Sequence, residues 1–343
     1  MTDTTRGRRR TWSAFGELRR LPTEYEIGTH GANWTTRQGR KTPLEQDPST
    51  PANQWLGANR DRSPFTVDDW DAFRDPDAMT YRRYVGMQSD QEAQVRGVLD
   101  QYSEAGADAR LAPEWRATLA GLFTPTRYPL HGFQQVHACF GYLAPSSYIT
   151  NAATFAAADL LRRVSLVAYR TRELSMSWPD EGFGTGERTV FESARAWQPA
   201  RAAVETALVT YDWAEAFAAV DLVLLPTLDD FLLRQLGELA RAHGDELTWL
   251  LLSFLAADSR RRDRWSAALA GYAIERRPEN AEVLRGWLDA WSARADDAVA
   301  GLATMLESLP AKGKPAAQAV AEARAARLAL HDRLGLAGEV GRR

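Results

Sequence analysis

Cysteine is almost missing from this chain, since its 343 residues include a single cysteine, Cys139. An internal disulfide is therefore impossible and a cysteine-rich metal site is excluded, which suits a reducing cytoplasm. Long apolar runs are missing too, because stretches such as 222–226 are far shorter than the roughly 20 residues that span a bilayer. The N-terminus has no apolar signal core. We expect a cytoplasmic protein with no membrane partner.

An excess of charge of one sign is also absent. The chain has 42 Lys and Arg residues against 45 Asp and Glu residues, which gives a formal net charge of -3. Such a chain produces no field that attracts polyanions, so nucleic acid is not an expected partner. Hydrophobic residues make up 45% and charged residues 25% of the chain, which are ordinary values for a globular protein that folds.

The first 65 residues lack a sustained helical period and are rich in proline, threonine and glycine. This composition predicts an extended N-terminal arm over residues 1–65. Each aromatic side chain in the arm needs roughly 150 to 250 Å² of cover, so we expect the arm to lie on another surface. The large aromatic residues of the arm are Trp12, Phe15, Tyr25, Trp34 and Trp55.

From residue 66 onward the apolar spacing is helical, and convincing strand alternation is absent. Long helices joined by short loops predict an all-α bundle over 66–310. A linker and a peripheral C-terminal helix are expected over 311–343. The predicted helices are 76–104, 114–123 with a second run ending at 143, 150–178, 199–243 with a kink at Pro226, 245–277, 280–309 and 316–334.

A helical bundle can hold two metal ions, usually through one glutamate from each of two helices and a Glu-x-x-His pair from each of two others. None of the five histidines has a carboxylate three residues before it. The densest group of possible ligands is His131, His137 and Cys139, but the two histidines point to different helical faces. We interpret this group as structural and expect no metal ligands in this chain.

Other patterns are also interpreted as structural. The glycine-rich stretch 182–186 has no Walker lysine and follows no strand, so it predicts a turn. Asp212 and Glu215 could share a helical face, but a solvated face or ion pairs with arginines are favoured over acid–base work. The arginine-rich run 259–265 predicts a charged helix surface that could be an interface. No catalytic or cofactor-binding residue is expected.

Several stretches carry a resemblance in their order and spacing. They are Arg10 to Trp12, Leu21 to Glu26, Ser63 to Phe65, Asp68 to Pro76, Thr124-Pro125, Arg127-Tyr128, Ala144 to Ser146, Ala168 to Leu174, Asp212 to Phe217, Arg264 to Ser266 and Gly286 to Asp289. Together they resemble the small (beta) subunit of the hydroxylase in bacterial multicomponent di-iron monooxygenases, in the toluene and alkene group. The resemblance covers about residues 10–308.

The resemblance implies a ferritin-like fold without metal ligands, packed against a large alpha subunit that holds the di-iron centre. It further implies a small gamma subunit, a paired hetero-oligomer and a coupling protein. A ferredoxin and a reductase, with an iron–sulfur cluster and FAD, would deliver electrons from NADH. The enzyme would be an O2-using monooxygenase of aromatic or alkene hydrocarbons, in which this chain has no active site of its own.

Two other hypotheses for the function of this chain remain beside the hydroxylase subunit. A self-sufficient helical enzyme should ligate iron by itself, which the missing Glu-x-x-His pairs disfavour. A free-standing helical scaffold should expose few apolar groups, which the aromatic arm disfavours.

Large aromatic residues are the usual anchors of obligate subunit contacts. We therefore predict that the five aromatic residues of the arm, together with Trp70 and Phe73 at its junction with the bundle, form the subunit interface. Each could instead cover this chain's own core, and for Trp70 and Phe73 that alternative is equally open.

Overall fold

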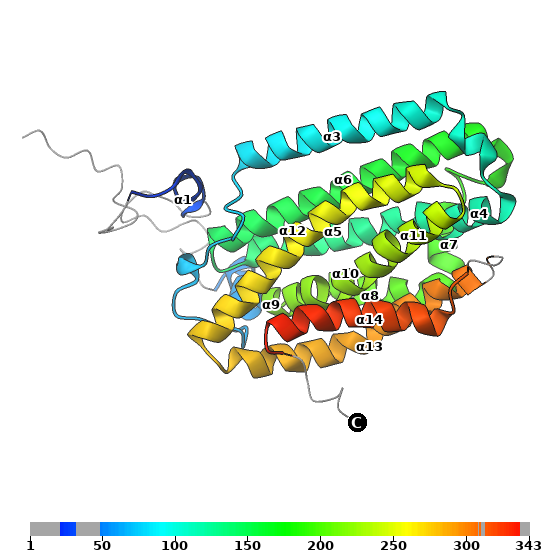
Figure 1. The fold of residues 1–343 in the computed structure, drawn as a ribbon. Coiled ribbons are helices and arrows are strands. Elements are labelled where there is room, and N and C mark those ends of the chain that lie inside the picture. Colours follow the sequence, from blue (N-terminus) through cyan, green and yellow to red (C-terminus); the bar gives the residue numbers. More distant parts are fainter. Residues whose placement is uncertain (1–20, 32–48, 308, 310–312, 337–343) are drawn as a thin grey trace, which may run out of the picture.

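The computed structural model describes residues 21–31, 49–307, 309 and 313–336. Every regular element within these residues is a helix, so the predicted all-α fold is confirmed. Figure 1 shows α3 along one edge of the bundle, α6 and α12 next to it, and α13 and α14 along the opposite edge. The longer helices are α3 (Tyr81–Glu104), α5 (Arg127–Leu143), α6 (Ser147–Ser177), α8 (Gln198–Leu208), α12 (Glu246–Arg276), α13 (Asn280–Glu307) and α14 (Ala316–Arg333).

Shorter helices connect these long ones. They are α1 (Glu24–Thr29), α2 (Pro51–Leu56), η3 (Gly57–Asp61), η4 (Trp70–Ala72), η5 (Ala107–Arg110), α4 (Pro113–Thr118), η6 (Leu119–Phe123), η7 (Thr124–Thr126), η8 (Pro179–Glu181), α7 (Glu187–Ser193), η9 (Arg195–Trp197), α9 (Trp213–Phe217), η10 (Ala218–Leu224), α10 (Leu225–Asp229), η11 (Asp230–Gln235) and α11 (Leu236–Ala242). The described part of the arm thus contains short helices rather than extended chain alone. No described helix is long and apolar enough to cross a membrane.

Helices α5 and α6 form a tight antiparallel pair. The side chain of Ser146 accepts the N–H of Tyr148 and caps α6, so the helix begins slightly before the predicted residue 150. A side chain at Gly141 would meet the Cβ of Ala153 at 2.9 Å. Glycine at this position therefore allows the two helices to approach each other closely.

The helix predicted from residue 76 begins later, at Tyr81. The carboxylate of Asp75 accepts the N–H groups of Asp77 and Met79 at 3.0 and 3.3 Å, which forms a turn instead of a first helical turn. Thr80 is the actual cap, because its hydroxyl accepts the N–H of Arg83 at 3.2 Å. The proline that suggested an earlier start therefore lies in the turn before the helix.

The prediction of one continuous helix over 199–243 is wrong, because the structure has a break within this segment. The chain leaves the helical conformation after α8 and re-enters it at α9, where the Asp212 side chain accepts the N–H groups of Ala214 and Glu215. Beyond α9 the segment alternates between α-helical and π-helical turns, namely η10, α10, η11 and α11. The distortion expected at Pro226 thus takes the form of wide turns on both sides of it.

Helix α14 is more firmly attached than a peripheral helix would be. Pro226 has no N–H, so the carbonyl of Leu222 cannot receive the usual hydrogen bond from residue 226. His331 of α14 lies against that carbonyl and donates from Nε2 at 2.8 Å. Burial lowers the pKa of His331, which favours the neutral ring. The C-terminal helix therefore supplies a hydrogen bond that the proline removes from the centre of the bundle.

Candidate functional site

The arginine-rich run on α12 is only partly a surface. Arg260 and Arg264, four residues apart, are exposed as predicted. Arg261 and Arg262, by contrast, are only 6% and 5% exposed. The prediction of a charged surface is therefore wrong for these two residues, because α12 lies between other helices and turns them into the interior. Two charged side chains that are this deeply buried need oppositely charged or hydrogen-bonding partners.

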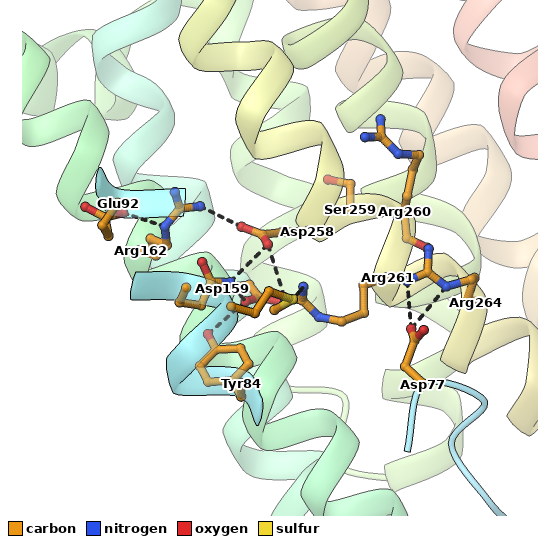
Figure 2. Close-up of polar contacts among 12 residues, drawn as sticks. Asp77, Tyr84, Glu92, Asp159, Arg162, Asp258, Ser259, Arg260, Arg261 and Arg264 are labelled. Carbon is orange, nitrogen blue, oxygen red and sulfur yellow. Dashed lines mark hydrogen bonds and ion pairs between the residues drawn. The ribbon is translucent and has the colours of Figure 1, made fainter. Parts of the chain in front are cut away.

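One group of partners, which we call the outer cluster, lies between α3, α6 and α12 (Figure 2). Its members are Tyr84, Gln88, Glu92, Asp159, Arg162, Asp258 and Arg261. Arg261 pairs with Asp159 and, at 3.1 Å, with Asp258. Gln88 Nε2 donates to the same two carboxylates, at 2.9 and 3.0 Å. One guanidinium and one amide are thus shared between two carboxylates.

This sharing affects the protonation of Asp159. Burial, followed by repulsion from the neighbouring Asp258 carboxylate, raises the pKa of Asp159 to about 7. The hydroxyl of Tyr84 donates to Asp159 at 2.8 Å, and burial raises the pKa of Tyr84 as well. Tyr84 and Gln88 are among the few buried residues of α3, so the outer cluster is a main attachment of that helix to the bundle.

A second group, which we call the inner cluster, lies deeper in the bundle. Its members are His137, Arg163, Asp221, Asp229, Ser259 and Arg262. Asp229 accepts from Arg163 at 2.7 Å, from Arg262 at 2.5 Å and from the Ser259 hydroxyl at 2.8 Å. Burial alone would raise the pKa of Asp229, but the two guanidinium groups outweigh it and hold that pKa at about 2.

The other half of the inner cluster is a histidine–aspartate pair. His137 Nε2 lies 2.8 Å from Asp221 Oδ1, and His137 Nδ1 lies 2.9 Å from the carbonyl oxygen of Phe133. Arg262 Nε lies 3.8 Å from the same Asp221 oxygen and links the two halves. His137 is completely buried, whereas His131 is exposed. Both ring nitrogens of His137 thus have partners within the bundle, whereas the packing role predicted for His131 does not fit its exposed position.

The geometry leaves little room for metal chemistry. The buried aspartates of both clusters are engaged with guanidinium groups, and no group of three or more His, Cys, Asp or Glu residues in the described chain is arranged to hold a metal ion. Asp212 caps α9, and Glu215 accepts the indole N–H of Trp291 at 3.2 Å. The carboxylates of Asp212 and Glu215 therefore have structural roles.

The sequence does contain a signal for the two clusters. The pattern Asp-x-x-Arg-Arg occurs on α6 as 159–163 and again on α12 as 258–262. In each copy the first arginine joins the outer cluster and the second joins the inner cluster. Residues three and four apart share a helical face, so this repeat is typical of two helices exchanging ion pairs.

The predicted interface residues fall into different environments. Trp12, Phe15 and Trp34 lie outside the described residues. The Tyr25 ring is buried 5.5 Å from the Tyr148 ring, and its hydroxyl accepts the N–H of Asp75. The arm is thereby fixed to this chain's own bundle at α1.

The remaining aromatic residues line the junction of arm and bundle. Phe73 is 1% exposed and packs in the core. Trp70 is half-buried, with its ring 5.3 Å from that of Trp213. Trp55 is 37% exposed and meets Tyr211 edge to face at 6.0 Å. Among the predicted interface residues that the structure describes, Trp55 is therefore the most exposed.

Comparison with known proteins identifies the family. A family model described as methane/phenol/alkene hydroxylase matches residues 55–277. The chain belongs to this hydroxylase family. The hydroxylase component subunit beta of the toluene-4-monooxygenase system of Ectopseudomonas mendocina is 38% identical over 305 residues, which cover 88% of this chain and 93% of that protein. The oxygenase component DmpL of phenol 2-monooxygenase from Pseudomonas sp. (strain CF600) is 24% identical over 71% of this chain and 72% of that protein.

Solved structures agree with this assignment. A chain of toluene 4-monooxygenase (T4moH), determined with toluene bound in the resting active site, matches with a TM-score of 0.80 and 37% identity, covering 84% of this chain and 95% of that chain. Xenon-pressurized phenol hydroxylase from Pseudomonas sp. OX1 matches in fold, with a TM-score of 0.81 at 19% identity over 96% and 94% of the two chains. The resemblance found in the sequence is confirmed: this protein is a hydroxylase subunit of a multicomponent monooxygenase.

Proposed function

We propose that this chain is the non-catalytic beta subunit of a di-iron hydroxylase that oxidises aromatic or alkene hydrocarbons with O2 and electrons from NADH. The observation that carries the proposal is the similarity to a toluene-4-monooxygenase beta subunit, which extends over 93% of that protein. The interior of the chain supports it, because the buried carboxylates are occupied by arginines instead of standing free as metal ligands.

In this proposal the alpha subunit holds the di-iron centre and the substrate pocket, and a gamma subunit completes a paired hetero-oligomer. A coupling protein docks on the hydroxylase, while a ferredoxin and a reductase, with an iron–sulfur cluster and FAD, deliver electrons from NADH in the cytoplasm. The arm, residues 1–65, contacts the alpha subunit, and the bundle over 66–310 with the segment 311–343 forms the body of this chain.

The interface is proposed to use the large aromatic residues of the arm. Tyr25 and Phe73 are already covered by their own chain, so they would support the interface from beneath and not contact the partner themselves. Trp55, exposed beside Tyr211, is the described residue best placed to insert into a partner.

The proposal is tested by reconstitution. The alpha and gamma subunits are combined with coupling protein, ferredoxin and reductase, with and without this chain, and NADH-dependent oxidation of toluene is measured. We expect turnover only when this chain is present, and none from this chain with the electron-transfer proteins alone. Full activity of the alpha and gamma subunits without it would contradict a supporting role, and turnover by this chain alone would contradict a non-catalytic one.

A further inference from the structure

The inner cluster receives side chains from four parts of the bundle. His137 comes from α5, Arg163 from α6, and Ser259 with Arg262 from α12. Asp221 and Asp229 come from η10 and α10. Proteins with ferritin-like bundles build their di-metal centres from side chains on four facing helices. The inner cluster therefore has the placement of such a centre, although its residues are not metal ligands.

The charges of the cluster also correspond to such a centre. Two aspartates, Asp221 and Asp229, face two guanidinium groups, those of Arg163 and Arg262. All four side chains are almost fully buried. Buried carboxylates need a compensating positive charge, and in a metal-bearing bundle the metal ions provide it.

The helix that carries the two aspartates is shaped around this position. Residues eight apart would point about 80° away from each other on an ideal helix. The wide π-helical turns of η10 include Asp221 and precede Asp229, and both aspartates are buried and paired with Arg262. Such π-helical turns are frequently found at functional sites.

Arg262 and Asp221 attract each other through their opposite charges but form no direct hydrogen bond. The nearest approach is 3.8 Å. Asp221 Oδ2 and Arg262 Nε, both buried, have no hydrogen-bond partner in the described part of the chain. The guanidinium of Arg262 thus balances the charge of the Asp221 carboxylate without a direct hydrogen bond to it.

We infer that the inner cluster occupies the place of the di-metal centre of a ferritin-like bundle, with the guanidinium groups of Arg163 and Arg262 replacing the positive charge of the metal ions. The inference concerns this chain's own fold, and only its second test below rests on the proposed function.

The first test is cation rescue of a variant. Arg262→Ala leaves Asp221 and Asp229 without their shared cation, and we expect the full chain's Tm to fall by roughly 5 °C or more. Zn²⁺ or methylguanidinium should restore much of that loss, whereas equal ionic strength of Na⁺ should not. Arg264→Ala, an exposed arginine on the same helix that pairs with Asp77, is the matched control and should show neither the loss nor the rescue. A folded Arg262→Ala protein that no cation stabilises would overturn the inference, as would equal rescue of the control.

The second test uses the unmodified protein in its assembled hydroxylase. Helices α5, α6, α10 and α12 of this chain are superposed on the matching helices of the iron-bearing subunit in a crystal structure of the complex. The iron positions should fall among Asp229, Arg262 and His137. Iron positions in the outer cluster or among apolar residues would refute the inference. If no iron-bearing partner assembled, the proposed function would fail, and the cation rescue would still decide the inference.

Discussion

Helices α8 and α13 meet through apolar side chains, whereas α6, α10 and α12 meet through the inner cluster. The buried side chains of α8 are all alanine or valine. A side chain at Gly301 of α13 would meet the Cγ of Pro199 of α8 at 3.2 Å, so the two helices approach each other closely and without charge. In the inner cluster each buried charge depends on a named partner. Contacts of the first kind tolerate small changes, because apolar attraction is spread over many atoms. Contacts of the second kind fail when one group is removed.

The largest effect is expected from Asp229→Ala. It leaves Arg163 and Arg262 buried without a counter-charge, and the free energy of unfolding should fall by about 3–5 kcal/mol. Glu192→Ala is the control, because it removes an exposed pair with Arg188, whose side chain is 74% exposed. That control should change stability by at most about 0.5 kcal/mol. Denaturant titration measures both, and equal losses would contradict the contrast between buried and exposed pairs.

A somewhat smaller effect is expected from Leu302→Ala in the apolar region. Leu302 is fully buried on α13, and its truncation should cost about 3 kcal/mol through lost burial and a residual cavity. Leu328→Ala, a partly exposed position on α14, should cost clearly less. Because Leu302 forms no ion pair itself, the Leu302→Ala loss should stay nearly constant with salt concentration and pH. A loss that varied strongly with pH would show that the two regions are coupled.

The pH dependence of stability should be smaller and opposite in sign at the two clusters. The pKa of Asp159 is raised from 3.8 to about 7 by burial and then by Asp258, so the folded chain binds this proton more tightly than the unfolded chain. Its contribution is complete below about pH 4 and is lost as the pH rises through about 7. Asp229, with its pKa lowered from 3.8 to about 2, contributes above about pH 4 and loses that contribution as the pH falls through about 2.

The Asp159→Asn variant removes the contribution of Asp159 to the pH dependence of stability. Between about pH 5 and pH 8, the unfolding free energy of the unmodified chain should decline relative to that of the Asp159→Asn variant. Chemical denaturation at several pH values provides the measurement. Parallel curves for the two proteins would mean that Asp159 is ionised throughout, fully compensated by Arg261.

The smallest effect on stability is expected at the surface of the junction. Trp55→Ala should change the unfolding free energy by about 0.5 kcal/mol or less, because Trp55 is 37% exposed. Its effect on assembly should be larger, about 2 kcal/mol in the affinity for the alpha subunit if Trp55 anchors the contact. Tyr25→Ala, which removes a ring buried against Tyr148, should lower stability as well. Unchanged affinity of the Trp55→Ala variant would remove Trp55 from the proposed interface.

Much of the fold follows from local signals in the sequence. Asp245 and Ser146 cap α12 and α6 near the predicted starts, and the glycine-rich stretch after α6 is a turn. The break before α9 was missed because residues 209–212 contain neither glycine nor proline, and it depends on capping by Asp212. Such a break is set by a single side chain and leaves the helical period on both sides intact.

The clusters were missed for a different reason. Periodicity treats arginine as a surface residue, so the pattern predicts Arg261 and Arg262 on the same solvated face as Arg260 and Arg264. Burial of a charge depends on which helices meet, and partners such as Asp229 lie more than 30 residues away in the sequence. The repeated Asp-x-x-Arg-Arg pattern indicates ion pairing between two helices, but it does not say which helices pack together.

The most direct test of a non-catalytic, iron-free subunit is native mass spectrometry with iron analysis of a complex purified through a tag on this chain, after co-expression with the other hydroxylase subunits. We expect a larger partner that carries all the iron, and an iron-free protein when this chain is produced alone. Iron bound stoichiometrically by the isolated chain, or the absence of any larger partner, would contradict it.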